Sequence, residues 1–264
     1  MAQKTKTIVF IHGLLLHASS WEKWMDFFNE RGYQTLNPGF PGDSPTVAEC
    51  RTNPDAMANR GIEEIVAHYT KIIADLPELP IVIGHSVGGL IAQILLGRNL
   101  ASGGIAIDAA PMKGVKEIPL SSLKASFPVI GNPFNLSKAF SNTYEQFRYG
   151  FANAVSEKEA RELYDRWAIP APCRPVFQVA LATLTGTETK VNTENTKRGP
   201  LLITAGEKDH HIPPVFGKAS LKRYNSSVVT DYKLFENRGH SLIIDHGWKE
   251  IAEYSLAWLK KNGL

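Results

Sequence analysis

The chain has 264 residues, of which 43% are hydrophobic and 21% are charged, and its formal net charge is +3 at pH 7. These proportions are those of a soluble globular protein, and a chain of this length can form one α/β domain. It has no run of five like charges and no stripe of aromatic residues among basic ones, which argues against a nucleic-acid partner. No apolar leader precedes the first apolar segment, so we expect a cytoplasmic protein.

The first segments of the chain alternate between strand and helix. Residues 7–11 are a short apolar run that predicts a buried strand, and His12-Gly13-Leu14 follows it. Ser19 or Ser20 is placed to cap a helix through residues 21–28. A short strand over residues 33–37 ends at a proline, and the irregular loop 39–45 comes next. We expect this loop to border the functional edge of the sheet.

The next segments repeat the alternation. Residues 61–76 place apolar side chains on one face of a predicted helix. Residues 79–97 contain no Asp, Glu, Lys or Arg, which is long enough to suggest a membrane span. This run contains Gly84, His85 and Ser86, however, and is better explained as a strand over 81–83 followed by a helix over 90–96. We therefore predict no membrane span, and a further strand over 104–108.

Between residues 111 and 199 the alternation stops and aromatic residues gather. Tyr144, Phe147 and Phe151 are spaced i, i+3, i+7, which is typical of one face of a helix. We expect residues 111–199 to form a helical cap inserted after a sheet strand, above Ser86. Most of its aromatic side chains would pack the cap onto the core. A few would line an apolar pocket, and the sequence does not say which.

The last part of the chain returns to strands that end in polar residues. Residues 200–205 form a predicted strand followed by Gly206-Glu207-Lys208-Asp209, and the predicted strand over 228–235 precedes Gly239-His240. The whole pattern predicts a mostly parallel sheet of about six strands with helices on both faces. Residues 1–110 and 200–264 would form this core.

The most informative motif is Gly84-x-Ser86-x-Gly88, between a predicted strand and a predicted helix. Glycines on both sides of a serine allow two chain segments to meet at a sharp turn, which exposes the hydroxyl. Asp209 and His240 follow other strands, in the order Ser, Asp, His. Because the carboxyl ends of parallel strands share one edge of a sheet, these three loops are able to converge.

Together these residues resemble the α/β-hydrolase superfamily, on its serine esterase or carboxylesterase side. The resemblance rests on His12-Gly13, the 84–88 motif, residues 206–209 and 239–240, and so spans nearly the whole chain. The family usually has extra strands before the His-Gly loop, so a shorter sheet is expected here, and the resemblance places the cap over residues 111–199 after the sixth family strand. A loop like 39–45 commonly has a glycine where this chain has Asp43.

The resemblance implies a role for each matching residue. Ser86 matches the nucleophile, His240 the base and Asp209 the acid, and the N–H groups of Leu14 and Val87 match the oxyanion hole. Asp108, which ends the 104–108 strand, is an alternative acid. His85 fills an elbow position that accepts many residue types.

The implied activity is hydrolysis of small to medium carboxylic esters, with no metal or organic cofactor. A lactonase, thioesterase, perhydrolase or hydroxynitrile lyase would use similar residues, and so would a ligand-binding receptor that kept the fold. His12 is expected to be structural, and His17 to lie outside the site. The adjacent His210 and His211 are not expected to share a metal ion. Neither Cys50 nor Cys173 belongs to a CxxC pair, and the oligomeric state stays open.

Overall fold

A computed structural model describes residues 5–182, 186–225 and 227–264. Its main sheet has six strands in the order β2-β1-β3-β4-β7-β8, and every neighbouring pair is parallel. The strands are β1 (Thr7–Ile11), β2 (Gln34–Leu36), β3 (Ile81–His85), β4 (Gly103–Ile107), β7 (Leu201–Gly206) and β8 (Thr230–Phe235). The predicted α/β-hydrolase fold, with about six mostly parallel strands, is confirmed.

The register of the strands brings their carboxyl ends to one edge. Ile11 of β1 pairs with Gly84 of β3, His85 pairs with Ile107 of β4, and Gly206 of β7 pairs with Phe235 of β8. The loops that follow these four strand ends and β8 therefore begin side by side. This edge receives the residues that the sequence singled out.

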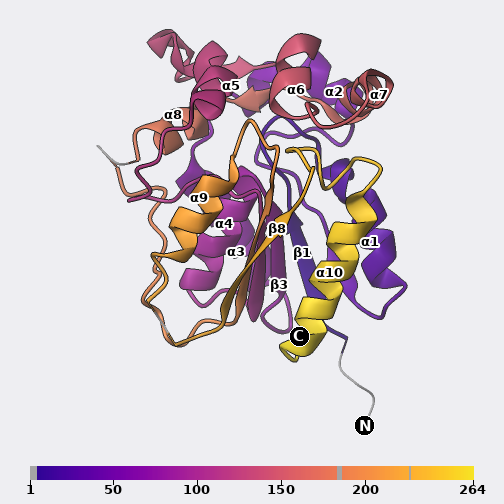
Figure 1. Ribbon diagram of the computed structural model, residues 1–264, viewed down its shortest axis with the longest axis vertical. Coiled ribbons are helices and arrows are strands. Elements are labelled where there is room, and N and C mark those ends of the chain that lie inside the picture. The colour runs from indigo at the N-terminus through magenta and orange to yellow at the C-terminus, as the bar shows by residue number, and fades with distance from the viewer. Residues whose placement is uncertain (1–4, 183–185, 226) are drawn as a thin grey trace.

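Helices cover both faces of the sheet (Figure 1). On one face lie α3 (Ile62–Ala74), α4 (Val87–Gly97) and α9 (Pro214–Leu221), and on the other α1 (Glu22–Asn29) and α10 (Trp248–Lys261). Every residue of α4 is buried, as is every residue of β3. Residues 80–97 of the uncharged run are thus buried in the core, whereas Leu79 is exposed. Within the described ranges, no helix is both long enough and apolar enough to cross a membrane.

The turn before α1 differs from the sequence expectation. A 3-10 helix, η1 (Ala18–Trp21), precedes α1, and the side chain of His17 accepts a hydrogen bond from the N–H of Ser19. The predicted cap at Ser19 or Ser20 is wrong, because the imidazole one turn earlier takes that place. Trp21 then stacks on Phe10 of β1, with 4.9 Å between ring centroids, which fixes α1 against the sheet.

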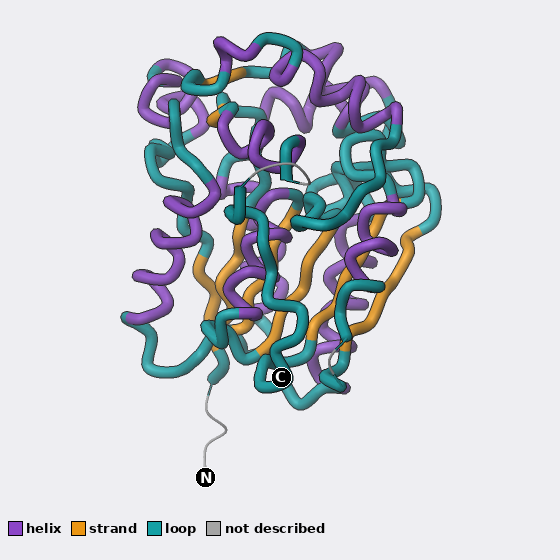
Figure 2. The backbone as a smooth tube through the Cα atoms, turned by 90° about the vertical axis from the view of Figure 1, so that its left-hand side faces the viewer, coloured by secondary structure: helices purple, strands orange, loops and turns teal. Residues whose placement is uncertain are grey.

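The elements between β4 and β7 lie across the carboxyl edge of the sheet, away from both chain ends (Figures 1 and 2). They are α5 (Leu120–Ile130), η3 (Pro133–Asn135), β5 (Ala139–Phe140), α6 (Tyr144–Gly150), α7 (Glu157–Trp167), β6 (Ala171–Pro172) and α8 (Arg174–Ala180). They are joined there by α2 (Val47–Thr52) and η2 (Pro54–Met57). We call residues 111–199 the cap segment. That it forms a unit separate from the core stays a prediction.

The aromatic residues of the cap segment divide into two groups. Phe147, Phe151 and Trp167 are buried, as expected of residues that pack the cap onto the core. Phe147 stacks on Phe151 with 5.1 Å between centroids, so the predicted helical face of α6 points inward. Phe127 and Phe134 are instead exposed, which the expectation of packing does not explain.

Candidate active site

The glycines on both sides of Ser86 are dictated by space. A Cβ on Gly84 would lie 2.0 Å from the carbonyl oxygen of Gly88, and one on Gly88 would lie 2.2 Å from that of Ile11. Ser86 sits between them at the turn from β3 to α4, with φ 57° and ψ −122°. A residue other than glycine is strained in this region, and such strain is found mainly at functional sites. The strand, turn and helix predicted around Ser86 are all present.

The turn after β1 passes beside Ser86. A Cβ on Gly13 would approach the Cβ of Ser86 to 2.9 Å, so a larger residue does not fit there. Leu14 follows this glycine, and Leu14 and Val87 line the same cavity as Ser86. Val87 is the first residue of α4, and the first N–H groups of a helix have no acceptor within the helix.

The imidazole of His240 is held by a buried carboxylate. Its Nδ1 lies 2.6 Å from Oδ2 of Asp209, and neither side chain is exposed to solvent. Oδ1 of Asp209 accepts hydrogen bonds from the N–H groups of His211 and Ile212 at 2.7 and 2.8 Å. Burial raises the pKa of Asp209, but the charge on His240 and these hydrogen bonds outweigh it, so the pKa is lowered. When His240 is neutral, the ionised carboxylate fixes its single proton on Nδ1 and leaves the lone pair on Nε2.

A second carboxyl group, that of Asp108, lies near the same nitrogen. Its Oδ2 is 3.9 Å from Nδ1 of His240 and has no hydrogen-bond partner among the described residues. Its Oδ1 accepts a hydrogen bond from the N–H of Gly206 at 2.7 Å. Burial and the negative charge of Asp209 raise the pKa of Asp108 well above its usual range. Of the two acids that the sequence left open, Asp209 makes the hydrogen bond to His240.

His85 holds the backbone of His240 in place. Its Nε2 donates a hydrogen bond to the carbonyl oxygen of His240 at 2.9 Å, and the two ring centroids are 4.5 Å apart. Burial and the nearby charge of His240 keep the pKa of His85 well below its usual range, so the ring is neutral. The family resemblance implied only that this elbow position accepts many residue types. No sequence signal reveals the contact, because its partner lies on a loop that follows β8.

His211 is a second contributor that the sequence does not reveal. Its ring lies parallel to that of His240, with 5.2 Å between centroids and 20° between planes, and it lines the cavity. Burial and the charge of His240 lower the pKa of His211 to about 3. His210 instead donates from Nδ1 to the carbonyl oxygen of Tyr149 at 3.0 Å. The two adjacent rings therefore have different partners.

One group of described residues has the spacing of a metal site. Ligand atoms of His85, Asp108 and His240 lie within 4.8 Å of one another. Nδ1 of His240 already donates to Asp209, and Nε2 of His85 donates to the carbonyl oxygen of His240. In the described part of the chain, Nδ1 of His85, Oδ2 of Asp108 and Nε2 of His240 have no hydrogen-bond partner, and we assign no metal to the group.

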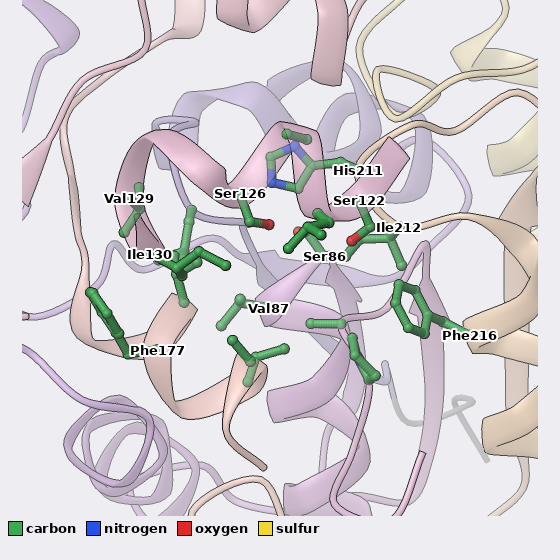
Figure 3. Close-up of a pocket in the computed structure, with 18 of the residues that line it drawn as sticks. Ser86, Val87, Ser122, Ser126, Val129, Ile130, Phe177, His211, Ile212 and Phe216 are labelled. Atoms are coloured by element: carbon green, nitrogen blue, oxygen red, sulfur yellow. The ribbon is translucent and has the colours of Figure 1, made fainter. Parts of the chain in front are cut away.

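An apolar cavity of about 480 Å³ opens beside Ser86. Ligand cavities commonly measure about 300–1,000 Å³. Its walls come from the elbow, from α5 and α8, and from the segment before α9. In Figure 3 the hydroxyl groups of Ser122 and Ser126 and the ring of His211 turn toward Ser86. Phe140, Phe151 and Phe177 are the aromatic residues of the cap segment that line this space.

The cap segment is also bonded to the loops that carry Asp209 and His240. The side-chain amide of Asn153 donates to the carbonyl oxygen of Lys208 at 2.7 Å. The N–H of Ser241 donates to the carbonyl oxygen of Phe151 at 2.9 Å. The cap segment therefore contacts both of these loops directly.

The contact between Ser86 and His240 and the positions of His12 and His17 complete the description of the predicted residues. No hydrogen bond joins Ser86 to Nε2 of His240 in the part of the chain that the structure describes. Such contacts are often long before substrate binds. Nε2 of His12 lies 3.0 Å from a carboxylate oxygen of Asp43, and the ring of His12 packs on Phe40. His17 is buried and does not line the cavity.

The sequence and the fold were compared with known proteins. The sequence model of the alpha/beta hydrolase family matches residues 8–254. No curated protein matches the sequence significantly. The matched range includes Ser86, Asp209 and His240.

Solved structures share this fold from end to end. A monoacylglycerol lipase from Paleococcus ferrophilus has a TM-score of 0.70 at 18% identity, covering 98% of this chain and 96% of that one. An extracellular alpha/beta-hydrolase from a Paenibacillus species has a TM-score of 0.67 at 20% identity, covering 96% and 98%. A pyrethroid hydrolase from Sphingobium faniae has a TM-score of 0.67 at 15% identity, covering 97% of each chain.

Proposed function

This chain belongs to the alpha/beta hydrolase family, and we propose that it hydrolyses carboxylic esters of small to medium chain length through an acyl-enzyme on Ser86. One observation carries the proposal. A buried hydrogen bond of 2.6 Å joins Asp209 to His240, in the loops next to a strained serine at an apolar cavity. That combination supplies a nucleophile, a base of defined tautomer and a place for an acyl group.

The first half of the proposed reaction forms the acyl-enzyme. Nε2 of His240 takes the proton of Ser86 Oγ while this oxygen bonds to the ester carbonyl carbon. The carbonyl electron pair moves onto oxygen, where the N–H groups of Leu14 and Val87 stabilise the negative charge. The carbon–alkoxy bond then breaks, and the departing oxygen takes the proton from His240.

The second half repeats these steps with water. A water molecule gives a proton to Nε2 of His240 and bonds to the acyl carbon. The bond to Ser86 Oγ breaks, Oγ regains a proton from His240, and the acid is released. Asp209 stays ionised throughout and balances the charge that His240 acquires. All these groups belong to this chain, and water is the co-substrate.

We propose that the cap segment, residues 111–199, closes the site above a core of residues 1–110 and 200–264. The cavity supports this division, because its walls come from both parts. Its lining is mainly apolar, which suits the hydrocarbon part of an ester, and its volume is within the range of ligand cavities.

Turnover of p-nitrophenyl acetate and p-nitrophenyl butyrate tests the activity. We expect the parent chain to hydrolyse both, and Ser86→Ala to lose turnover by about 10⁶-fold. Ser44→Ala is the matched control, since Ser44 is at a loop that does not line the cavity. Equal rates for the parent chain and Ser86→Ala would refute the mechanism.

The nucleophile is tested separately by covalent labelling. A fluorophosphonate reacts with a serine that a neighbouring base activates, so we expect a single labelled peptide that contains Ser86. His240→Ala should abolish the labelling while the protein still folds. A label on any other residue contradicts the assignment.

A further inference from the structure

The outer face of α5 is apolar, although it is exposed to solvent. Leu120, Leu123 and Phe127 are spaced i, i+3, i+7 and are all exposed, whereas Ser122 and Ser126, on the other side of the helix, line the cavity. A surface helix ordinarily turns its apolar stripe toward the core. Here a second apolar stripe faces solvent, while the cavity side of the helix has Ser122 and Ser126 together with the apolar Ala125, Val129 and Ile130.

This stripe is part of a larger apolar surface. Exposed apolar side chains continue on the segments before and after the helix, and Asn135 of η3 donates to the carbonyl oxygen of Val129, which holds η3 beside α5. We call this surface the cap patch: Ile118 (77% exposed), Leu120 (82%), Leu123 (41%), Phe127 (63%), Phe134 (80%) and Leu136 (42%). Apolar patches of this kind mark interaction sites.

The cap patch borders the cavity. Ile118 and Leu123 belong to the patch and also line the cavity, and so does the exposed Leu181 nearby on the cap segment. Residues that are both exposed and part of the lining mark where a cavity meets solvent. Whatever covers the cap patch therefore controls access to Ser86.

Basic residues accompany the patch. From residue 111 to residue 138 the chain has four lysines and one glutamate, a net charge of +3. Lys116, Lys124 and Lys138 are exposed, as is the single acid, Glu117. Lysines beside exposed apolar groups favour a surface that is both apolar and negatively charged, and each adds attraction to anionic lipid headgroups.

We propose that the cap patch docks the protein on an anionic phospholipid surface, with the cavity opening toward the lipid. A second copy of this chain on the patch would block the opening, whereas a lipid surface would supply apolar esters directly to it. The delivery of substrate rests on the proposed ester hydrolase. The docking itself depends only on the patch and its lysines.

Co-sedimentation with vesicles tests the docking without turnover. The Ser86→Ala chain is mixed with vesicles of phosphatidylcholine alone or with phosphatidylserine added. We expect it to sediment with the mixed vesicles, and more weakly with phosphatidylcholine alone. A chain that stays in the supernatant with both vesicles overturns the proposal, while the proposed hydrolysis of soluble esters would stand.

Variants identify the surface. Leu120→Ser/Phe127→Ser/Phe134→Ser removes exposed side chains that do not line the cavity, and vesicle affinity should fall by at least about 100-fold. The matched control is Leu79→Ser/Val229→Ser, at two exposed apolar positions that precede β3 and β8 at the opposite edge of the sheet. The control should bind as the parent does. Equal binding by the patch variant overturns the proposal.

Two further measurements separate the sources of binding. Lys124→Gln/Lys138→Gln should weaken binding to the phosphatidylserine vesicles by about 25-fold, or about fivefold per lysine, and leave binding to phosphatidylcholine alone unchanged. In chains that keep Ser86, the patch variant should hydrolyse p-nitrophenyl acetate at the parent rate. A dimer in analytical ultracentrifugation that the patch variant dissociates would instead assign the patch to self-association and overturn the lipid proposal.

Discussion

Replacing Asp209 with alanine should cost less activity than replacing it with asparagine, because Asp108 is placed to take over. Oδ2 of Asp108 is 3.9 Å from Nδ1 of His240 and makes no hydrogen bond within the described residues. Alanine removes the carboxylate and opens space beside the imidazole. Asparagine fills that space and turns its NH₂ group toward Nδ1, which forces the proton of His240 onto Nε2.

The size of the difference follows from the two distances. With an effective dielectric constant of about 20, opposite unit charges attract by about 6 kcal/mol at the 2.6 Å of Asp209 and by about 4 kcal/mol at the 3.9 Å of Asp108. Losing about 2 kcal/mol slows the reaction about 30-fold. An imidazole held in the wrong tautomer costs about 10⁴-fold. Asp209→Ala should therefore be roughly 300 times faster than Asp209→Asn.

The rescue should depend on pH in one direction. Only the ionised form of Asp108 balances the charge on His240, and burial raises the pKa of this carboxyl group. The activity of Asp209→Ala should thus be present above the pKa of Asp108 and be lost as the pH falls through it. Removing Asp209 also removes the negative charge that raises the pKa of Asp108 further. The activity of Asp209→Ala should therefore be lost at a pH below the pKa that Asp108 has in the parent protein.

The assay is kcat/KM for p-nitrophenyl butyrate across pH, for Asp209→Ala, Asp209→Asn and Asp209→Ala/Asp108→Asn. We expect the double variant to fall to the level of Asp209→Asn and to lose the pH-dependent rise. If Asp209→Ala and the double variant have the same kcat/KM at every pH, Asp108 contributes nothing and the reasoning is refuted.

Three further predictions concern single residues. His85→Leu should lower kcat with little change in KM and destabilise the fold by about 1–3 kcal/mol in urea, because it leaves the His240 carbonyl unpaired; an unchanged kcat contradicts this. The pKa of His211 is about 3 in the folded chain and about 6.5 in the unfolded chain, so the folded state loses stability as the pH falls below 6.5. His211→Gln should therefore reduce the loss in unfolding free energy between pH 7 and pH 5 by about 2 kcal/mol. Equal losses in the parent and variant chains would count against this prediction. Gly88→Ala should prevent folding or lower Tm sharply, because its Cβ would lie 2.2 Å from the carbonyl oxygen of Ile11. Gly97→Ala should change Tm by a few degrees at most, because its Cβ would come no closer than 3.2 Å to the backbone of Asn192.

The elements that carry the predicted site could be derived from the sequence because their signals are local. The turn at Ser86 needs glycine at Gly84 and Gly88, and the close contacts that require them follow from a strand meeting a helix. Parallel strands then place the loop of Asp209 beside that of His240, where the two side chains form a hydrogen bond of 2.6 Å. Choosing Asp209 over Asp108 did need the structure, since both residues end or follow strands at the same edge.

The contacts of His85 and His211 could not be derived in this way. Each of these side chains is placed by a residue on another loop: His85 bonds the His240 carbonyl 155 positions away, and the ring of His211 stacks on that of His240. A histidine beside a motif has the same local pattern whether it is buried in the site or exposed. Only the convergence of loops at the sheet edge distinguishes the two cases.

In the cap segment, too, the spacing of residues along the sequence does not determine which side chains are buried. Tyr144 and Phe147 of α6, with Phe151 directly after the helix, have the same i, i+3, i+7 spacing as Leu120, Leu123 and Phe127 of α5. Phe147 is nevertheless fully buried, whereas Phe127 is 63% exposed. Spacing determines which side chains share a face of a helix, but the neighbouring element determines which way that face points. For α6 this neighbour is α7, where Tyr164 packs on Phe147 with 5.4 Å between ring centroids. For the outer face of α5 no described element supplies such a ring or aliphatic cover, so the stripe remains available to a partner outside the chain.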